Sequence, residues 1–198
     1  MPSGMSFTQK QRALIELSNR ADGCIDCQLH QERSSVVFGQ GTAEARVLVV
    51  GEAPGKNEDL QGIPFVGRSG KLLRQAFSAV GLSEQFVYIT NVVKCRPPDN
   101  RNPRPPELAA CRYYLDRQLE LIDPEIILSL GNFALRYFLG ESHKISTARG
   151  QSYQFDKFKL IPTYHPSYLL YSHNPEINSR FQADLRLAVE HLEERSAR

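Results

Sequence analysis

RVLVVGEAPG, residues 46–55, decides the fold of this chain. Its first half is a continuous apolar run ending in glycine, which is typical of a strand buried on both faces of a parallel sheet. Its second half is a loop whose glycines and proline let main-chain amides approach a flat ligand. Because ligands of open α/β sheets bind outside the carboxyl ends of the strands, this stretch predicts a strand that leads into a binding site.

Further strands and helices alternate along the chain. Strands are predicted at VYITNVV (87–93), EIILSLG (125–131) and KLIPTYH (159–165), with an edge hairpin in QSYQFDKFKLIP (151–162). Helices are predicted at residues 6–23, 69–81, 105–122, 132–140 and 177–194. The alternation predicts an α/β fold with a central, mostly parallel, four-stranded sheet flanked by helices.

We predict one domain. Residues 24–192 form its body, residues 1–23 are an N-terminal helix of the same domain that leads to a pair of cysteines, and residues 193–198 are a charged tail. Ser6 and Gln9 have the spacing of a capping box at the start of the first helix, and Gly23 follows its end.

The composition is that of an ordinary globular protein. Of the 198 residues, 41% are hydrophobic and 23% are charged, and the formal net charge is +2. This charge is too small to indicate a nucleic-acid binder, so any site for a polyanion must come from a local cluster. No apolar run reaches the ~18 residues that a membrane-spanning helix requires, and the N-terminus has no apolar signal core. We expect a cytoplasmic monomer with no membrane segment.

Basic side chains gather between residues 94 and 117, where six lysines and arginines stand against three acidic residues. The members that precede the predicted helix are Lys94, Arg96, Arg101 and Arg104. Such a cluster is suited to nucleic-acid phosphates. The alternative is a solvated surface loop followed by an ordinary charged helix.

The four cysteines have the ligand count of one metal centre. Cys24 and Cys27 form a close pair in CIDC, whereas Cys95 and Cys111 are separated by fifteen residues. The spacing suits a tetrahedral zinc ion or a [4Fe-4S] cluster, and the long separation of the second pair favours the larger centre. Two disulfides or four unrelated buried thiols are the alternatives, and disulfides would need an oxidising compartment.

The loop after the first strand has no standard nucleotide-binding motif. GEAPGK is one residue short of a phosphate loop between its glycines, and Asn57 stands where Ser or Thr must meet magnesium. What remains is a strand-end turn with Glu52 beside it. Asn91 and His165 end two other predicted strands and should converge on the same edge of the sheet. Phe65, in GIPFVG, could stack there on a planar base or fill the core.

Four strings together resemble the family 4 uracil-DNA glycosylases, the iron-sulfur branch of the uracil-DNA glycosylase superfamily. GEAPG resembles the first active-site motif of that family and PFVG its stacking segment. TNVVKCRPPDNRNP resembles the strand that recognises the pyrimidine together with the cluster loop, and HPSYLL the second active-site motif. The resemblance runs from Cys24 to about Pro175. It implies that Cys24, Cys27, Cys95 and Cys111 bind a [4Fe-4S] cluster.

The resemblance also implies the reaction, which is hydrolysis of the N-glycosidic bond of deoxyuridine in single- or double-stranded DNA. It implies a uracil site formed by Glu52, Ala53, Pro54, Phe65, Asn91 and His165. Phe65 would stack on uracil, the Asn91 amide would pair with the uracil edge, and His165 would donate a hydrogen bond to O2 as negative charge grows there.

The partner of the attacking water is less well defined by the resemblance. Ala53 stands where the best-known branch of the superfamily has a water-orienting aspartate. Glu52 is then the nearest carboxylate and the expected catalytic partner, with Glu58 and Asn100 as further candidates. By the same resemblance, Lys94, Arg96, Arg101 and Arg104 would contact the DNA backbone.

Two other classes of protein fit parts of the pattern. A noncatalytic zinc module could use the cysteines and the basic loop only to bind nucleic acid, and its purified form would be colourless rather than brown. An electron-transfer protein could use a cluster directly, and it would have no use for Asn91 or His165.

Overall fold

The computed structural model describes residues 5–172 and 174–196. Its helices are α1 Phe7–Asp22, α2 Lys56–Gln61, α3 Arg68–Val80, α4 Pro105–Ile122, α5 Gly131–Leu139, α6 Ile145–Ala148, α7 Pro166–Tyr171 and α8 Pro175–Ser196. Its strands are β1 Gln40–Gly41, β2 Val47–Gly51, β3 Val87–Asn91, β4 Ile126–Leu130, β5 Tyr153–Phe155 and β6 Phe158–Thr163. Short 3-10 helices lie at η1 Gln28–Gln31, η2 Glu84–Phe86 and η3 Pro98–Asn100.

The strands of the described chain form one sheet in the order β1-β3-β2-β4-β6-β5. The four central strands are parallel, as predicted, and β1 and β5 add antiparallel edges. The predicted count of four strands is therefore wrong, because the sheet has six. The predicted edge hairpin is β5 with β6. The missed strand, β1, has only two residues and pairs with Tyr88 and Ile89.

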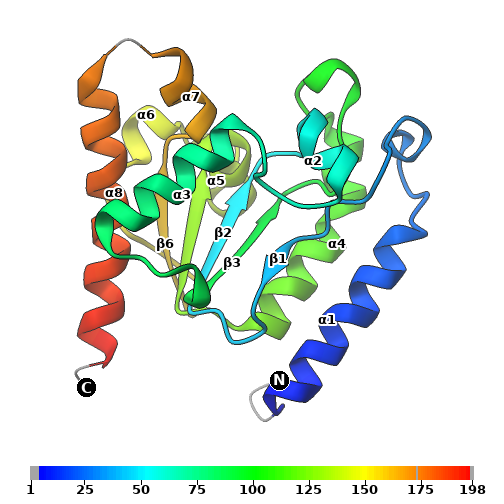
Figure 1. Ribbon diagram of the computed structural model, residues 1–198, viewed down its shortest axis with the longest axis horizontal. Coiled ribbons are helices and arrows are strands. Elements are labelled where there is room, and N and C mark those ends of the chain that lie inside the picture. The colour runs from blue at the N-terminus through cyan, green and yellow to red at the C-terminus, as the bar shows by residue number, and fades with distance from the viewer. Residues whose placement is uncertain (1–4, 173, 197–198) are drawn as a thin grey trace.

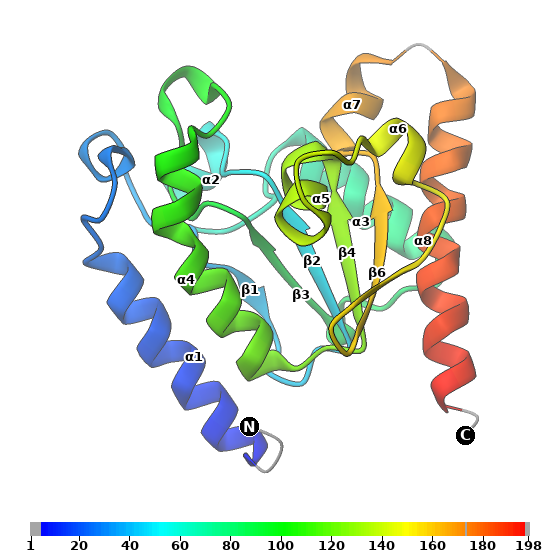
Figure 2. The same cartoon turned by 180° about the vertical axis from the view of Figure 1, so that it is seen from behind.

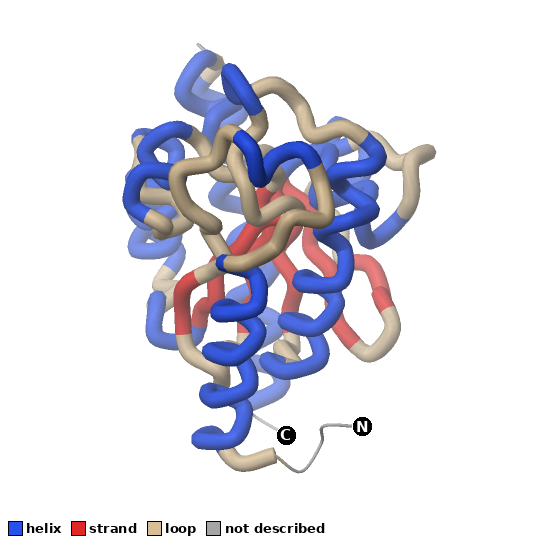
Figure 3. Tube along the Cα trace, turned by 90° about the vertical axis from the view of Figure 1, so that its right-hand side faces the viewer, coloured by secondary structure: helices blue, strands red, loops and turns tan. Residues whose placement is uncertain are grey.

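Each face of the sheet is covered by helices (Figures 1 and 2). Leu48 and Val50 of β2 belong to the core shared with α1, α4 and α5. Val47 and Val49 belong to the core shared with α3 and α8. Side chains alternate between the faces of a strand, so a strand that is buried on both faces must be apolar throughout. This is why residues 47–51 of this stretch, VLVVG, contain no polar side chain. The side view shows the sheet enclosed between helices (Figure 3).

Helix α1 lies on the outer side of α4, away from the sheet (Figure 1). The predicted capping box is present: Gln9 N–H donates to the Ser6 hydroxyl, and Ser6 N–H donates to the Gln9 side chain. Lys10 Nζ donates to the carbonyl oxygen of Ile122 at 3.2 Å. The helix thus leads the chain along α4 to the first cysteine pair.

At the other end of the chain, α8 runs to Ser196, so the first part of the predicted charged tail continues that helix. Residues 197–198 of that tail, like residues 1–4 of the predicted N-terminal segment, lie outside the described residues. Every helix in the described part of the chain is too short or too polar to span a membrane.

Candidate active site and cysteine centre

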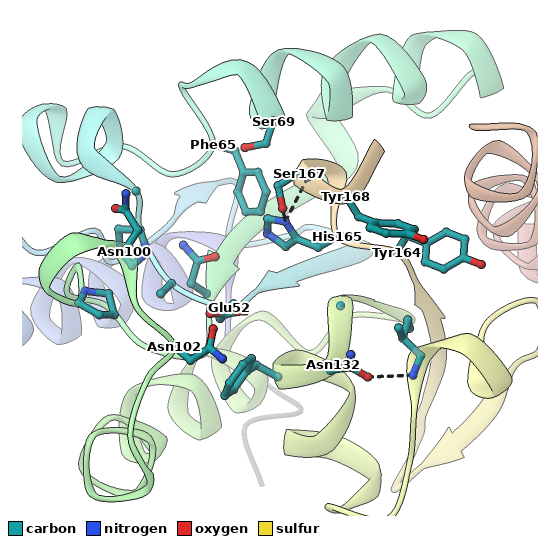
Figure 4. A pocket seen from close by; sticks show the side chains of 18 of the residues that line it. Glu52, Phe65, Ser69, Asn100, Asn102, Asn132, Tyr164, His165, Ser167 and Tyr168 are labelled. Carbon is teal, nitrogen blue, oxygen red and sulfur yellow. Dashed lines mark hydrogen bonds between the residues drawn. The ribbon is translucent and has the colours of Figure 1, made fainter. Parts of the chain in front are cut away.

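A cavity of about 810 Å³ opens at the carboxyl ends of the parallel strands. The sequence-predicted residues that line it are Glu52, Ala53, Pro54, Glu58, Phe65, Asn91, Asn100, Arg101 and His165. We call this cavity the base pocket. Figure 4 shows how side chains from separate segments of the chain face it. Strand-end positions that are far apart in the sequence are thereby brought together, as the rule for parallel sheets requires.

Asn91 ends β3 and lies almost fully buried between Gly51 and the pocket. Its carboxamide oxygen is shielded from solvent and has no hydrogen-bond partner among the described residues. A buried acceptor without a partner costs about 1–3 kcal/mol. A ligand that presents an N–H group to this oxygen would recover that energy, so the pocket is prepared for a donor at this point.

Phe65 holds its ring beside the imidazole of His165, with 5.8 Å between the ring centroids and 35° between the planes. Its backbone has a φ of 54°, in the left-handed region that a bulky residue rarely adopts. Two contacts hold it there. Arg74 Nη1 donates to the Phe65 carbonyl oxygen at 2.6 Å, and a Cβ on Gly70 would stand 1.6 Å from the same oxygen. Helix α3 therefore fixes the backbone of Phe65 in this conformation.

His165 is the N-cap of α7, and Pro166 occupies the first position of that helix. Its Nδ1 accepts a hydrogen bond from the main-chain N–H of Ser167 at 3.2 Å and lies 2.7 Å from the Ser167 hydroxyl. An N–H can only donate, so Nδ1 is the unprotonated nitrogen and Nε2 carries the proton. Burial lowers the pKa of His165 to about 4. The ring is thus neutral at pH 7 and has an N–H donor at Nε2.

Two carboxylates line the pocket in different states. Burial raises the pKa of Glu52 to about 7, which places its titration near neutral pH, where a catalytic base is most effective. Glu58 is instead engaged, because its Oε1 accepts a hydrogen bond from the main-chain N–H of Gly67 at 2.7 Å. Glu52 is therefore the carboxylate in the pocket that titrates near neutral pH, whereas Glu58 is held by a main-chain hydrogen bond.

Asn100 lines the pocket from η3 with a φ of 54°, and its side-chain oxygen accepts from Arg96 Nε at 2.8 Å. Sequence reasoning missed several pocket residues, among them Ser69, Asn102, Asn132, Tyr164 and Tyr168. Asn132 could have been found, since it lies two residues after the end of β4, at the same edge of the sheet where Glu52 follows β2. Ser69 and Tyr164 lie in the predicted helix 69–81 and the predicted strand 159–165, but no motif marked their side chains as part of the site. Asn102 and Tyr168 lie on segments whose path the sequence does not specify.

The prediction that Lys94 of the basic loop contacts the DNA backbone is wrong. Lys94 is 1% exposed and cannot reach a DNA phosphate. Its Nζ donates to Gln118 Oε1 at 2.6 Å and, at 2.7 Å each, to the Thr90 hydroxyl and the Asn91 carbonyl oxygen. Burial lowers the pKa of Lys94 to about 7, and the neighbouring Cys111 and Cys95 oppose that shift. This lysine is part of the interior.

The three arginines of the loop differ in how free they are. Arg101 forms a two-pronged ion pair with Glu107, with distances of 2.6 and 2.9 Å. Arg96 is held by Asn100. Arg104 is exposed, and its side chain has no ion pair among the described residues. Arg104 is thus the member of the cluster with the most available charge.

All four cysteines line a second, smaller cavity between the loop after α1 and helix α4. Cys95 accepts a hydrogen bond from Arg33 Nη1 at 3.2 Å, and Cys111 accepts one from the main-chain N–H of Lys94 at 3.2 Å. Burial raises the pKa of Cys95 and raises that of Cys111 to about 12. The thiols are buried, and hydrogen-bond donors face two of the sulfur atoms.

The four thiols have the ligand type and number that an iron-sulfur cluster requires. Among residues 5–172 and 174–196, no three Cys, His, Asp or Glu side chains are placed around one metal ion. Yet four thiols from three segments share one cavity. An iron-sulfur cube binds one thiolate at each of four corners and so holds its ligands farther apart than one ion does. The N–H donors to sulfur are the kind of contact that supports such a centre.

The fold and the base pocket together define an α/β enzyme with a site for a flat, hydrogen-bonding ring. The family model described as the Uracil DNA glycosylase superfamily matches residues 38–192. A type-4 uracil-DNA glycosylase of Thermotoga maritima is 44% identical over 178 residues, covering 88% of this chain and 93% of the relative. Those of Archaeoglobus fulgidus and Sulfurisphaera tokodaii are each 43% identical, over 90% and 82% of their lengths.

The chain belongs to the uracil DNA glycosylase superfamily and, within it, to the type-4 uracil-DNA glycosylases. It is a glycosidase of DNA repair that acts on uracil-containing DNA. The resemblance seen in the sequence is confirmed, and the noncatalytic zinc module and the electron-transfer protein are not supported as alternatives.

Proposed function

We propose that this enzyme is monofunctional, flips deoxyuridine out of DNA and hydrolyses its N-glycosidic bond. The products are free uracil and an abasic site for base excision repair. Flipping is required because a base inside the duplex cannot reach a pocket formed at the ends of buried strands, and extrusion costs a few kcal/mol. Phe65 is positioned to stack on the extruded ring, and the residues around it contact the ring edge and the reacting bond.

The observation that carries this proposal is the buried, unpartnered carboxamide oxygen of Asn91, a residue that lines the base pocket. Uracil presents N3–H and O4 side by side. The oxygen and nitrogen of one carboxamide complement that pair as acceptor and donor. Cytosine presents an unprotonated N3 and an N4 amino group instead, which reverses both partners. The site therefore favours uracil through a buried polar contact, the kind that discriminates most strongly between bases.

His165 supplies the principal stabilisation of the leaving group in this proposal. As the bond from C1′ to N1 breaks, negative charge grows on the uracil O2. A neutral imidazole with its proton on Nε2 can donate a hydrogen bond to that oxygen without first gaining a proton. The contact from Ser167 to Nδ1 fixes the tautomer that this role requires.

Glu52 is the proposed partner of the attacking water. Its pKa of about 7 leaves a useful fraction of carboxylate at neutral pH. The carboxylate would orient a water and accept its proton as the water attacks C1′. Ala53 and Pro54, which also line the pocket, would shape the wall that keeps other water away.

The test is incubation with a uracil-containing oligonucleotide, followed by alkaline cleavage at abasic sites. After incubation with wild-type protein, alkali should cleave single- and double-stranded substrates at the position of uracil. Asn91→Asp replaces the donor with an oxygen that repels the uracil O4, so uracil release should fall by several kcal/mol in transition-state stabilisation. Release at the wild-type rate by that variant would show that Asn91 does not recognise the base.

We further propose that Cys24, Cys27, Cys95 and Cys111 hold a [4Fe-4S] cluster. When bound, such a cluster supplies a rigid anchor that joins distant segments, and its binding energy becomes folding energy. Purified protein should be brown and contain iron and sulfide in equal amounts. Stoichiometric zinc in anaerobically purified protein would contradict this. Cys111→Ser should lose iron and lower the melting temperature.

We also propose that the loop at residues 96–104 grips the DNA backbone, chiefly through Arg104. A monomer is the proposed active form, and the cytoplasm its proposed location. The large hydrophobic side chains that are exposed are spread over several elements: Phe7 and Ile15 lie on α1, Phe86 on η2, Tyr113 on α4, and Tyr168 and Tyr171 on α7. Scattered apolar residues of this kind do not indicate an obligate interface. Light scattering at working concentrations tests the monomer.

A further inference from the structure

The side chain of Lys94 lies in a fully buried polar network. Its Nζ has three oxygen partners, on Thr90, Asn91 and Gln118. Three acceptors match the three N–H bonds of a protonated amine. The Gln118 amide extends the network to the carbonyl oxygen of Phe38 at 2.9 Å. Because an unpaired polar group is so costly here, a fully connected network of this kind fixes the positions of its members.

Main-chain contacts tie the same residue to two other segments. Lys94 N–H donates to Cys111 Sγ on α4 at 3.2 Å, and Lys94 C=O accepts from Val37 N–H at 2.7 Å. Every hydrogen-bonding group of Lys94 is thus engaged. Lys94 also lines the cysteine cavity, while Asn91, three residues earlier, lines the base pocket.

Residues 91–95 therefore form a short bridge between the two cavities. At one end is the side chain of Asn91, and at the other is the thiol of Cys95. Between them, Val92 N–H donates to the Gly51 carbonyl oxygen at 2.9 Å and Val93 N–H to that of Glu52 at 3.1 Å. The bridge consequently positions Asn91 and the main chain of Glu52 together.

We propose that Lys94 is a positioning residue for uracil hydrolysis: through the Asn91 carbonyl it fixes the carboxamide of Asn91 and links it to the cysteine-bearing helix α4. The inference rests on the proposed role of Asn91 in binding uracil. Lys94 touches neither base nor water in this account. Its loss should therefore be felt through Asn91 alone.

The main variant is Lys94→Met, which keeps an unbranched chain of similar length and removes the donors. Its single-turnover rate of uracil release should fall by about 10- to 100-fold, the cost of a small misplacement of a reacting or recognising group. Iron content and affinity for uracil-free DNA should stay within about twofold of wild type, a small change on the free-energy scale. Lys71→Met, at an exposed lysine of α3, is the matched control and should leave the rate unchanged.

A double-mutant cycle separates positioning from general damage. If Lys94 acts through Asn91, adding Lys94→Met to Asn91→Ala should slow release no further, because the group being positioned is already absent. If the rate reductions caused by Lys94→Met and Asn91→Ala instead multiply in the double variant, the proposal is wrong. Thr90→Val removes one acceptor of the network with little change of shape, and it should show the same dependence on Asn91 even if Lys94→Met fails to fold.

The outcomes distinguish the two proposals. If wild-type protein releases no uracil, the proposed function fails and the cycle has no rate to report. If wild-type protein is active but Lys94→Met and Thr90→Val both lose iron, or both act independently of Asn91, only the positioning role is wrong.

Discussion

The carboxamide oxygen of Asn91 lies 2.4 Å from the point that a Cβ atom on Gly51 would occupy. The tip of the Phe65 ring is 2.7 Å from the same point. Cβ atoms do not approach other atoms this closely, so the last residue of β2 must be glycine. The missing side chain of Gly51 leaves the space in which Asn91 and Phe65, the two groups that we propose contact the base, meet.

Gly51→Ala should therefore lower uracil release by about 100-fold, because either Asn91 or Phe65 must move. The measurement is the single-turnover rate, with circular dichroism to confirm folding. Gly81→Ala is the control. Gly81 has a φ of 75° and open space around it, so alanine there should cost about 1 kcal/mol of stability but no activity. Equal rates for the Gly51 variant and wild type would show that the pocket tolerates displacement.

His165→Ala should reduce the rate of uracil release by about 100-fold or more, as the loss of a principal oxyanion donor does, with DNA binding nearly unchanged. Ser167→Ala is the matched control: it removes the hydroxyl near Nδ1 but keeps the N–H that fixes the tautomer. Its effect should be only a few-fold. Similar losses in the two variants would assign the effect to the structure of α7 rather than to the imidazole.

The pH dependence of His165 follows from its lowered pKa of about 4, against 6.5 for the free side chain. The unfolded chain binds the proton more readily, so this contribution to stability is complete above about pH 6.5 and is lost as pH falls toward 4. Melting temperatures of wild type and His165→Gln should therefore diverge between pH 7 and pH 4. Parallel curves would contradict a buried, neutral ring.

The contribution of Glu52 to stability should change with pH in the opposite direction to that of His165. Its pKa is raised from 4.5 to about 7 in the folded protein, so the stability that it contributes is present below pH 4.5 and is lost as pH rises through 7. Glu52→Gln should gain stability relative to wild type at pH 8 but not at pH 4.5. The pH–rate profile of uracil release should lose its ionisation near pH 7, and the rate should fall by about 100-fold. A rate that still rises through pH 7 in this variant would assign the ionisation to another group.

Arg104→Gln should weaken binding to all DNA sequences and reduce the slope of log K against log salt concentration by about one phosphate equivalent. Arg101→Gln should alter that slope less, because Arg101 is already paired with Glu107. Its main effect should be on stability, since it leaves a nearly buried carboxylate without its cation. Equal slopes for Arg104→Gln and wild type would remove this loop from the DNA interface.

The central strands could be predicted because each is an unbroken apolar run, and burial on both faces permits no other pattern. Strand β1 could not, since Gln40 and Gly41 owe their pairing to the exposed edge of β3 rather than to any preference of their own. Whether a segment pairs with an edge strand depends on where the fold places it. Two residues are also too few to show the alternation of apolar and polar side chains that identifies a strand.

The position of Lys94 could not be predicted from the sequence for a similar reason. In the sequence it is one cation among several in a loop, and burial of a lysine is rare enough that a surface position was the reasonable expectation. Its partners Thr90 and Gln118 are ordinary polar residues that only the packing of α4 against β3 brings together. By contrast, Asn91 and His165 could be placed from the sequence, because both follow strands and parallel strands end at one edge.

The way α1 is attached also determines which part of the protein unfolds locally first. Apart from the cysteine pair at its end, this helix is held mainly by its packing on α4, with Lys10 bonded to Ile122 and Arg20 to Tyr113. The sheet, in contrast, is closed on both faces. We expect the amide hydrogens of α1 to exchange through a local unfolding of low free energy that leaves the strands protected. Removal of the cysteine centre should lower the free energy of this local unfolding before it affects the sheet. The earliest sign of damage to the centre would thus be local fraying of one helix in a protein whose sheet stays intact.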